Sequence, residues 1–391
     1  MKIALADILG PAPDPLRLAT LDAMACTARE ERLKRIRERV GERAPEWLAF
    51  GERNRVGPLV AHAILDALGP NDPARDDARR IHDAEAERMR VMMGELDAVA
   101  ARLAKDGIKV VALKNAGIAR GLFPCAACCP MGDVDLLVDP VRFKEAHAGV
   151  LDCGFKLDTR AEFIGSELEA GIKHGGTEYL KQRGPHTVWF ELQWRPVAGR
   201  WIRPEQEPKA ADLLARAVPV AGSAVHLLAP ADNLLQVCLH TTKHSYARAP
   251  GLRLHTDVDR LAHYAPPDWD AFVAAAGSLT VKTACYFALA LAEALLRSEI
   301  PDRVLAALAP DPGKTAAVVS TLRRADVFEP DGRKFSRLGM LRFHARLYDD
   351  AAGFWASVFD TDRGRLGLRH LPSNLWRGAR RAADVLFRFQ S

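Results

Sequence analysis

Apolar residues recur at helical spacing through roughly the first hundred residues. From about residue 15 to about residue 70 the run includes Leu18, Leu21 and Met24, and the pair Gly57-Pro58 interrupts it. Residues 75–106 predict one long charged helix, whose apolar side carries Met89, Met92, Met93, Leu96, Val99 and Leu103. Gly107 follows as the expected C-cap residue. The pattern predicts a helical N-terminal part of the chain.

The pattern then changes to short apolar runs and alternation, which are typical of strands. The sequence predicts strands over residues 108–113, 133–138, 154–158, 177–181 and 186–195, and helices over residues 116–123 and 139–151. After about residue 205 the spacing is helical again, over residues 230–246, 252–264, 269–276 and 280–297. We therefore expect an α+β protein, in which an α/β core with a small mixed sheet (residues 91–205) lies between an N-terminal helical region (residues 1–90) and a C-terminal helical domain (residues 206–391).

Two carboxylates, Asp133 and Asp135, stand two positions apart at the head of an apolar run. In a strand, the side chains at positions i and i+2 leave from the same face, so these two would lie side by side. Neighbouring carboxylates repel each other unless a cation lies between them, which favours a site for a divalent metal. An Asp-x-Asp pair at a strand end is also often a solvated loop end, so the pair alone leaves both interpretations open.

A third carboxylate strengthens the metal interpretation. Glu191 lies on a later predicted strand, on one face with Thr187, Trp189 and Gln193. Its aromatic and aliphatic neighbours predict that it is at least partly buried, where a charge is costly unless it is paired or bound to metal. Three carboxylates on adjacent strands would provide the oxygen ligands that Mg²⁺ prefers.

These residues belong to a longer pattern. Leu113-Lys114-Asn115 and Gly132-Asp133-Val134-Asp135-Leu136-Leu137-Val138 resemble the nucleotidyltransferase superfamily, in which a turn after a strand precedes an Asp-x-Asp strand and a later third carboxylate. The sequence more narrowly resembles the uncharacterised nucleotidyltransferase family, through Leu227-Leu-Ala-Pro-Ala-Asp-Asn-Leu-Leu235, Cys238-Leu-His240-Thr-Thr-Lys243-His244, Asp257 and Trp269. The resemblance covers most of residues 30–300 and implies a polymerase-beta-like fold.

The resemblance implies an enzyme that transfers a nucleoside monophosphate from a nucleoside triphosphate, with ATP expected, to an acceptor hydroxyl on a small molecule or a peptide, releasing pyrophosphate. Asp133, Asp135 and Glu191 would be the catalytic residues and would hold two Mg²⁺ ions. The residues that would bind nucleotide and phosphate are Lys114, Asn115, Gly132, His240, Lys243 and His244. Replacing Asp135 by alanine is expected to abolish transfer and to leave the fold intact.

Three positions depart from the family pattern. Asn115 stands in place of a glycine, Cys129 in place of an arginine and Gln193 in place of a histidine. These changes keep open the alternative of a catalytically weakened nucleotide-binding or scaffold protein. A further alternative is a toxin-like enzyme that modifies tRNA, which the arginines near the C-terminus favour: Arg377, Arg380, Arg381 and Arg388.

Histidines and cysteines outside the carboxylate pattern leave further alternatives open. His240 and His244 have the i, i+4 spacing of zinc-binding helices, but no glutamate follows His240, so structural and ligand-contacting histidines are alternatives to zinc ligands. Asp257 could support these histidines, cap its helix or form a salt bridge. Cys125, Cys128 and Cys129 provide a Cys-x-x-Cys pair, which would suit zinc or a redox function. Because the chain has no second such pair and the segment lies in the loop leading to Asp133 and Asp135, incidental thiols in a loop are the favoured interpretation.

Composition adds constraints on partners and location. The chain has 391 residues and a formal net charge of +5, and its Lys and Arg residues are not densely clustered, so nucleic acid is left open as a partner without being favoured. No apolar run approaches the roughly 20 residues that span a bilayer, so no membrane partner is expected. Asp7 and the prolines after it make the N-terminus a poor signal peptide. Seven scattered cysteines suit the reduced thiols of a cytoplasmic protein.

Overall fold

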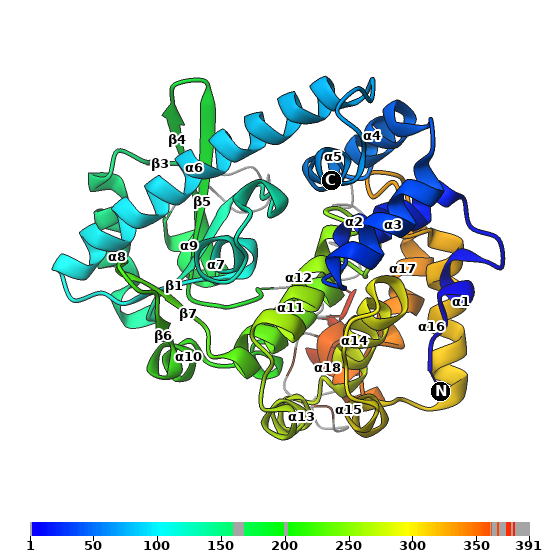
Figure 1. The fold of residues 1–391 in the computed structure, drawn as a ribbon. Coiled ribbons are helices and arrows are strands. Elements are labelled where there is room, and N and C mark those ends of the chain that lie inside the picture. Colours follow the sequence, from blue (N-terminus) through cyan, green and yellow to red (C-terminus); the bar gives the residue numbers. More distant parts are fainter. Residues whose placement is uncertain are drawn as a thin grey trace.

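The structure, a computed structural model, has an α+β fold in which a seven-stranded mixed sheet lies beside a larger body of helices (Figure 1). It describes residues 2–158, 168–198, 202–359, 361, 366, 373–376, 378 and 379. The long helix α6 (Arg75–Lys105) begins against α5 (Gly57–Ala67) in the helical body and crosses to the sheet, so it connects the two parts. Among the described residues, no helix combines the length and the apolar character that crossing a membrane requires.

The sheet has the strand order β3-β4-β5-β2-β1-β7-β6. The strands are β1 (Val110–Ala112), β2 (Val134–Leu137), β3 (Lys156–Leu157), β4 (Gly176–Arg183), β5 (His186–Gln193), β6 (Val218–Pro219) and β7 (Val225–Leu227). The central strand β2 runs parallel to β5 and antiparallel to β1, and β1 runs parallel to β7. The remaining pairs, β3 with β4, β4 with β5 and β6 with β7, are antiparallel.

One face of the sheet packs against α6 and α8 (Phe143–Asp152). Val134 and Leu136 of β2, together with Phe190 and Leu192 of β5, form a buried apolar cluster with side chains of these two helices. Successive side chains of a strand point to opposite faces. The residues between these apolar positions, including Asp135 and Glu191, therefore lie on the face turned away from α6 and α8.

The helices of the sheet part are α7 (Lys114–Gly121), α8, α9 (Leu168–His174) and α10 (Ala210–Arg216), with short 3₁₀ turns η1 (Ala126–Cys128), η2 (Pro140–Arg142) and η3 (Pro204–Gln206). The helical body contains α1 (Leu5–Leu9), α2 (Pro15–Met24), α3 (Arg29–Val40), α4 (Ala44–Arg53), α5, α11 (Pro230–Lys243), α12 (Arg253–Tyr264), α13 (Trp269–Ser278), α14 (Lys282–Leu296), α15 (Asp302–Leu308), α16 (Pro312–Ala325), α17 (Arg337–Ala345) and α18 (Ala351–Phe359).

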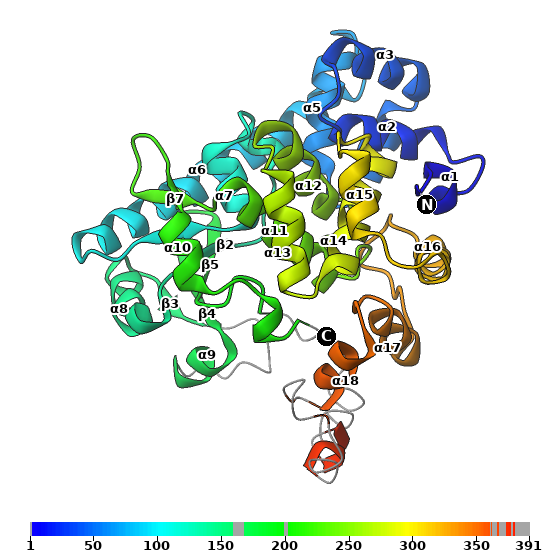
Figure 2. The same cartoon turned by 90° about the horizontal axis from the view of Figure 1, so that it is seen from below.

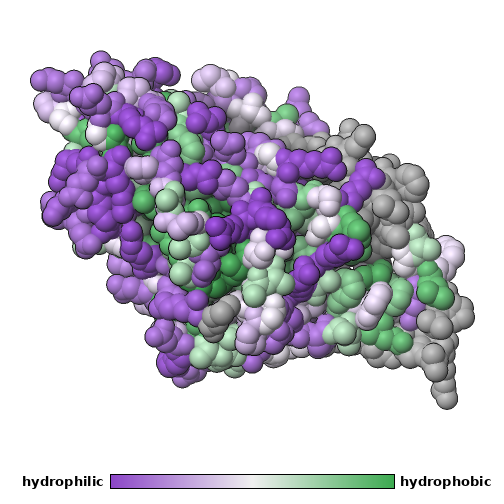
Figure 3. All heavy atoms as spheres, turned by 90° about the vertical axis from the view of Figure 1, so that its right-hand side faces the viewer, coloured by the Kyte–Doolittle hydropathy of each residue, from purple (hydrophilic) through white to green (hydrophobic). Residues whose placement is uncertain are grey.

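Early and late segments of the chain share the core of this helical body. One hydrophobic cluster includes side chains from α1 to α5 and from α11 to α17, and Figures 1 and 2 both show α1 beside α16. The fully buried carboxylate of Asp22 in α2 accepts hydrogen bonds from Arg35 of α3 and from Arg297 at the end of α14. The face shown in Figure 3 is largely hydrophilic, with apolar residues in smaller patches. The two helical regions expected from sequence thus pack together.

The predicted helices and strands occur with ends shifted by a few residues, but the prediction of helix after residue 205 is wrong in one stretch. Strands β6 and β7 lie there, and β7 extends the sheet by pairing with β1. These strands have two and three residues, too few to show a strand period, and only their pairing with distant residues defines them. Helix α9 was not predicted either.

Candidate active site

Three carboxylates gather where β2 and β5 run side by side. The parallel register of these strands pairs Asp135 directly with Glu191. Asp133 lies two residues before Asp135, just ahead of the first residue of β2. Asp135 is 3% exposed, whereas Asp133 and Glu191 are half-buried. The structure therefore brings together the three carboxylates that the sequence analysis singled out, on the face of the sheet opposite to α6.

A buried lysine contacts the central carboxylate. The backbone N–H of Leu113, at the end of β1, donates to the carbonyl of Asp135, which aligns the two chains at this point. Lys114 follows, and its Nζ donates to Oδ1 of Asp135 at 2.6 Å. The Nε2 of Gln193 donates to the same oxygen at 2.7 Å. Asp135 thus has a cation and a neutral donor on one oxygen.

The turn between β1 and α7 has an unusual backbone conformation at Lys114. Its φ is 53°, a left-handed conformation that non-glycine residues adopt at a cost. Asn115, which stands in place of the family's glycine, lies within α7 and does not have a positive φ. The strained residue is therefore the one whose ammonium group contacts Asp135.

Burial and neighbouring charges set the protonation of this pair. Burial raises the pKa of Asp135 well above its ordinary value; Lys114 opposes this shift, and the charges of Asp133 and Glu191 add to it. Burial alone would lower the pKa of Lys114, but the carboxylates of Asp135, Glu191 and Asp133 outweigh it and raise that pKa. Lys114 therefore stays protonated, and the crowding of negative charge around Asp135 is only partly balanced.

Helix α11 brings further nitrogen groups to the carboxylates. Burial lowers the pKa of Lys243, and the nearby charge of Lys114 lowers it further, while Glu191 and Asp135 oppose the shift. Its Nζ donates to the carbonyl of Val197 at 3.1 Å. Lys243 thus lies within the electrostatic reach of both Lys114 and the carboxylates.

The two histidines of this helix form a neutral pair beside Lys243. The ring centroids of His240 and His244 lie 4.8 Å apart. Burial, helped by neighbouring lysines, lowers the pKa of His240 well below its ordinary value and that of His244 to about 3. Both imidazoles are therefore uncharged near neutral pH. The buried Nδ1 of His240 has no hydrogen-bond partner, so a polar ligand group could satisfy it.

Arg253, the first residue of α12, was missed in the sequence. Burial lowers the pKa of its guanidinium, and the nearby carboxylates of Asp257 and Asp133 oppose this shift. Its buried Nε has no hydrogen-bond partner. The available signal was its position four residues before Asp257, which places both on one helix face. Arg253 is thus a third cation near the carboxylates, with an unsatisfied donor.

The three departures from the family pattern each have a partner in the structure. Gln193 bonds to Asp135, as described above. The Nδ2 of Asn115 donates to Oδ1 of Asp257 at 2.8 Å, and burial raises the pKa of Asp257 to about 6 against the opposing charges of Arg260 and Arg253. Asp257 therefore accepts a hydrogen bond from Asn115, and among the described residues no hydrogen bond or ion pair joins it to His240 or His244.

The thiol of Cys129 lies in contact with an arginine side chain from a helix that is distant in sequence. Arg260 of α12, 1% exposed, donates to the Sγ of Cys129 at 3.1 Å and to the carbonyl of Cys128 at 2.6 Å. The guanidinium of Arg260 thus lies beside residue 129, the position at which the family pattern has an arginine in the sequence. The substitution at residue 129 does not remove cationic charge from this loop.

The loop before β2 contains Gly132, which has free space around its Cα atom. Gly132 is exposed, its φ is not positive, and a Cβ atom added to it would meet no atom within 4 Å. Neither backbone conformation nor packing therefore requires glycine there. Close approach of a ligand to the backbone next to Asp133 is a reason that remains.

By their chemistry the three carboxylates suit a hard divalent cation, although as they stand they are not among the described groups of three or more side chains whose ligand atoms are close enough to share one ion. Carboxylate oxygens are the donors that Mg²⁺ prefers, and a cation would relieve the repulsion that raises the pKa of Asp135. Oδ1 of Asp135 already accepts bonds from Lys114 and Gln193. A cation there would share this carboxylate with Lys114 or displace its ammonium group.

Comparison with known proteins identifies one family. A family model described as uncharacterised nucleotidyltransferase matches residues 42–297. This range includes every residue of the carboxylate site and the whole of the sheet. No curated protein and no solved structure showed a significant similarity to the chain.

Proposed function

The chain belongs to the uncharacterised nucleotidyltransferase family, and on that premise we propose that it transfers a nucleoside monophosphate from ATP to a hydroxyl group of an acceptor, with release of pyrophosphate. The observation that carries this proposal is the pairing of Asp135 with Glu191 across two parallel strands, with Asp133 beside them and Lys114 bonded to Asp135. The clustered carboxylates provide negative charge for the metal ions of a metal-bound nucleotide, and the buried cations next to them provide positive charge for its phosphates.

Each group has a distinct role in this proposal. Asp133, Asp135 and Glu191 would hold two Mg²⁺ ions, which would neutralise the triphosphate and lower the pKa of the acceptor hydroxyl. The acceptor oxygen attacks the α-phosphorus, and the bond from that phosphorus to the oxygen bridging to the β-phosphorus breaks. The hydroxyl proton passes to Glu191. Gln193, through its bond to Asp135, fixes the orientation of that carboxylate.

The nitrogen groups bind the leaving pyrophosphate. Lys114, Lys243 and Arg253 are the cations whose charges act on the carboxylate site, and Arg253 has an unpartnered Nε to offer. The neutral imidazoles of His240 and His244 serve as hydrogen-bonding groups, since burial keeps them uncharged. Asn115 lies in the first turn of α7 and Gly132 in the loop before β2, where backbone N–H groups can approach phosphate.

We propose a small molecule or a peptide as the acceptor. The alternative of tRNA was motivated by Arg377, Arg380, Arg381 and Arg388, which lie outside the described residues. The alternative of a weakened binding or scaffold protein was motivated by Asn115, Cys129 and Gln193. Each of these residues retains a polar contact in the structure, which supports an intact site and favours the enzyme.

The proposal is tested by following pyrophosphate. The full-length protein is incubated with Mg²⁺ and each of the four labelled nucleoside triphosphates, with and without a panel of hydroxyl-bearing small molecules, peptides or tRNA. Acceptor-dependent pyrophosphate release with ATP and no labelled RNA supports the proposal. Labelled tRNA would support the toxin-like alternative, and nucleotide binding without turnover under every condition would support the scaffold alternative.

A further inference from the structure

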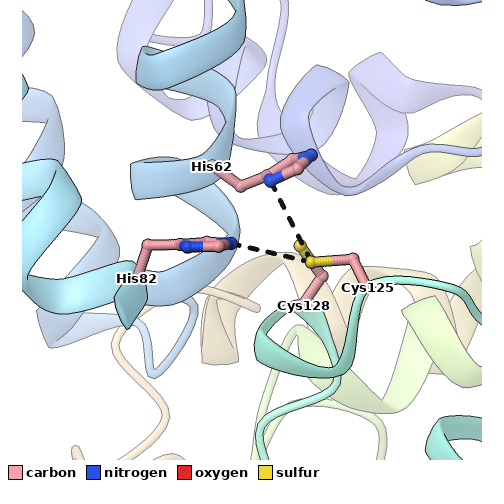
Figure 4. Close-up of side chains that lie close together, drawn as sticks. All are labelled: His62, His82, Cys125 and Cys128. Atoms are coloured by element: carbon pink, nitrogen blue, oxygen red, sulfur yellow. Dashed lines mark hydrogen bonds between the residues drawn. The ribbon is translucent and has the colours of Figure 1, made fainter. Parts of the chain in front are cut away.

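A second group of metal-ligating side chains lies outside the carboxylate site. His62 of α5, His82 of α6, Cys125 just before η1 and Cys128 at the end of η1 point toward one another (Figure 4). One potential ligand atom from each residue lies within 4.8 Å of the others. Among the described residues, it is the one group of three or more His, Cys, Asp or Glu side chains that are close enough to share an ion.

The distances suit a tetrahedral ion after a small contraction. The Sγ of Cys125 lies 4.0 Å from Nδ1 of His62 and 3.7 Å from Nε2 of His82. A zinc ion with sulfur ligands at about 2.3 Å and nitrogen ligands at about 2.0–2.1 Å needs neighbouring ligand atoms roughly 3.3–3.8 Å apart. Side-chain rotations that move the ligand atoms by about 1 Å would bring them to these separations. Two thiolates with two imidazoles are a ligand set that favours zinc.

The local backbone already presents both sulfurs to one point. The N–H of Cys128 donates to the carbonyl of Cys125 at 3.1 Å, which closes a tight turn between the two cysteines. Cys128 is 4% exposed, whereas Cys125 and both histidines are half-buried. The Cys-x-x-Cys spacing is the one most structural zinc sites use.

The outer nitrogens of both histidines face carboxylates. Nε2 of His62 lies 3.8 Å from Oδ2 of Asp66, one helical turn later, and Nδ1 of His82 lies 3.3 Å from Oδ1 of Asp83. Such carboxylates orient the rings of metal-bound histidines and fix which nitrogen faces the ion. In each ring, the nitrogen that remains is the one facing Cys125.

We propose that His62, His82, Cys125 and Cys128 bind one structural zinc ion. The ion would join α5 and the start of α6 to the loop that leads into Asp133. Two further bonds hold the same loop: Arg88 of α6 donates to the carbonyl of Met131 at 2.5 Å, and Arg260 donates to the carbonyl of Cys128. The zinc site therefore positions the loop ahead of β2 and contributes no ligand to the carboxylate site.

This proposal changes the interpretation of the cysteines. The sequence favoured incidental thiols because it has no second Cys-x-x-Cys pair. The partners are instead two histidines, which lie 63 and 43 residues before Cys125 and on different helices. A disulfide between Cys125 and Cys128 is the competing state of these thiols. It would not explain why two histidines, each with a carboxylate at its outer nitrogen, face Cys125.

The test measures zinc in the full-length protein, purified with a reductant and without chelator. We expect about one zinc ion per chain by elemental analysis, and visible absorption typical of tetrahedral Co²⁺ with thiolate ligands after exchange. Cys125→Ser and His82→Ala should lose most of the metal, whereas the control Cys153→Ser, at a cysteine outside the cluster, should retain it.

A second measurement keeps the test independent of whether these variants fold. Chelator added to the wild-type protein should release zinc and two titratable thiols together and should lower the melting temperature, and added Zn²⁺ should restore it. Reduced wild-type protein that takes up no zinc would overturn the proposal, and so would zinc bound equally by wild type and both cluster variants. A disulfide that persists in reduced, zinc-supplemented protein would overturn it as well.

Discussion

The Nζ of Lys114 lies 2.6 Å from Oδ1 of Asp135, and both side chains are almost entirely removed from solvent. Two opposite charges in such a place stabilise each other, and either one alone would be costly to bury. The cation that contacts the central carboxylate is thus part of the folded core as well as of the proposed site. Variants at these two residues will change stability and activity together.

Replacing Lys114 by methionine should destabilise the protein by about 3–5 kcal/mol, because Asp135 would remain buried without its cation. Urea unfolding measures this loss. The matched control is Lys109→Met, which removes an exposed lysine whose Nζ donates to the carbonyl of Leu214. Equal, small effects of the two substitutions would show that the buried pair contributes little.

The same pair corrects one expectation from the sequence. Asp135→Ala was expected to leave the fold intact, but in the structure it leaves the buried ammonium of Lys114 without its closest counter-charge. We therefore expect this variant to lose stability as well as activity. Glu191, which is half-buried and contacts Asp135 across the sheet, is the better position for a catalytic test.

Arg253→Met should weaken binding of nucleoside triphosphate by roughly 10- to 100-fold, since a hydrogen bond to a charged group contributes about 1.5–3 kcal/mol. Calorimetric titration with a triphosphate and with the matching nucleoside measures the effect, which should be confined to the triphosphate. Arg303→Met, at an exposed arginine paired with Asp270, serves as the control. Unchanged triphosphate affinity in Arg253→Met would remove this residue from the phosphate site.

Cys129→Arg, which installs the residue of the family pattern, should destabilise the protein by about 3–5 kcal/mol, because it places a second guanidinium beside the buried Arg260. Adding Arg260→Ala should recover part of this loss, so that the double variant is more stable than the sum of the single effects predicts. Thermal or urea unfolding of the three variants gives the coupling. Additive effects would contradict the view that the guanidinium of Arg260 lies beside residue 129 and interacts with an arginine there.

Stability should fall as the pH is lowered from about 6.5. Burial lowers the pKa of His255 to about 4 and that of His344 to about 3, whereas unfolded histidine titrates near 6.5. Between these values the unfolded chain binds more protons than the folded one, so each histidine reduces the free energy of unfolding by up to about 1.4 kcal/mol per pH unit of acidification. Urea unfolding from pH 7 to pH 5 measures the slope.

Substitution identifies the histidines responsible for that slope. His344→Gln should make the pH dependence shallower, because glutamine does not titrate. His263→Gln, at an exposed histidine, is the matched control. A slope that is the same in His344→Gln as in the wild type would contradict the assignment.

The sequence predicted the parts of the site that depend on local pattern. Alternation along β2 and β5 placed Asp133, Asp135 and Glu191 on one face, and the strand end placed Lys114 near them. The missed parts depend on contacts between distant segments. Arg253 reaches the carboxylates from α12, and the short strand β7 is defined by its pairing with β1.

The protonation states of the site residues could not be predicted from residue spacing either. The spacing of His240 and His244 on one helix face was evident, but their uncharged state depends on burial between α11 and its neighbours. The same holds for Asn115, whose partner Asp257 lies 142 residues later in the chain. Residue spacing predicts which side chains share a face, and packing decides what they meet there.

The most direct test of the central claim compares pyrophosphate release by wild type, Glu191→Gln and Glu145→Gln. Each protein is incubated with ATP, Mg²⁺ and an acceptor that the wild-type protein uses. Glu145 is an exposed glutamate paired with Arg142, so its substitution makes the same chemical change away from the site. We predict that Glu191→Gln loses at least about 100-fold in transfer rate while melting at a temperature close to that of the control. Transfer by Glu191→Gln at the rate of Glu145→Gln would show that these carboxylates do not carry the reaction.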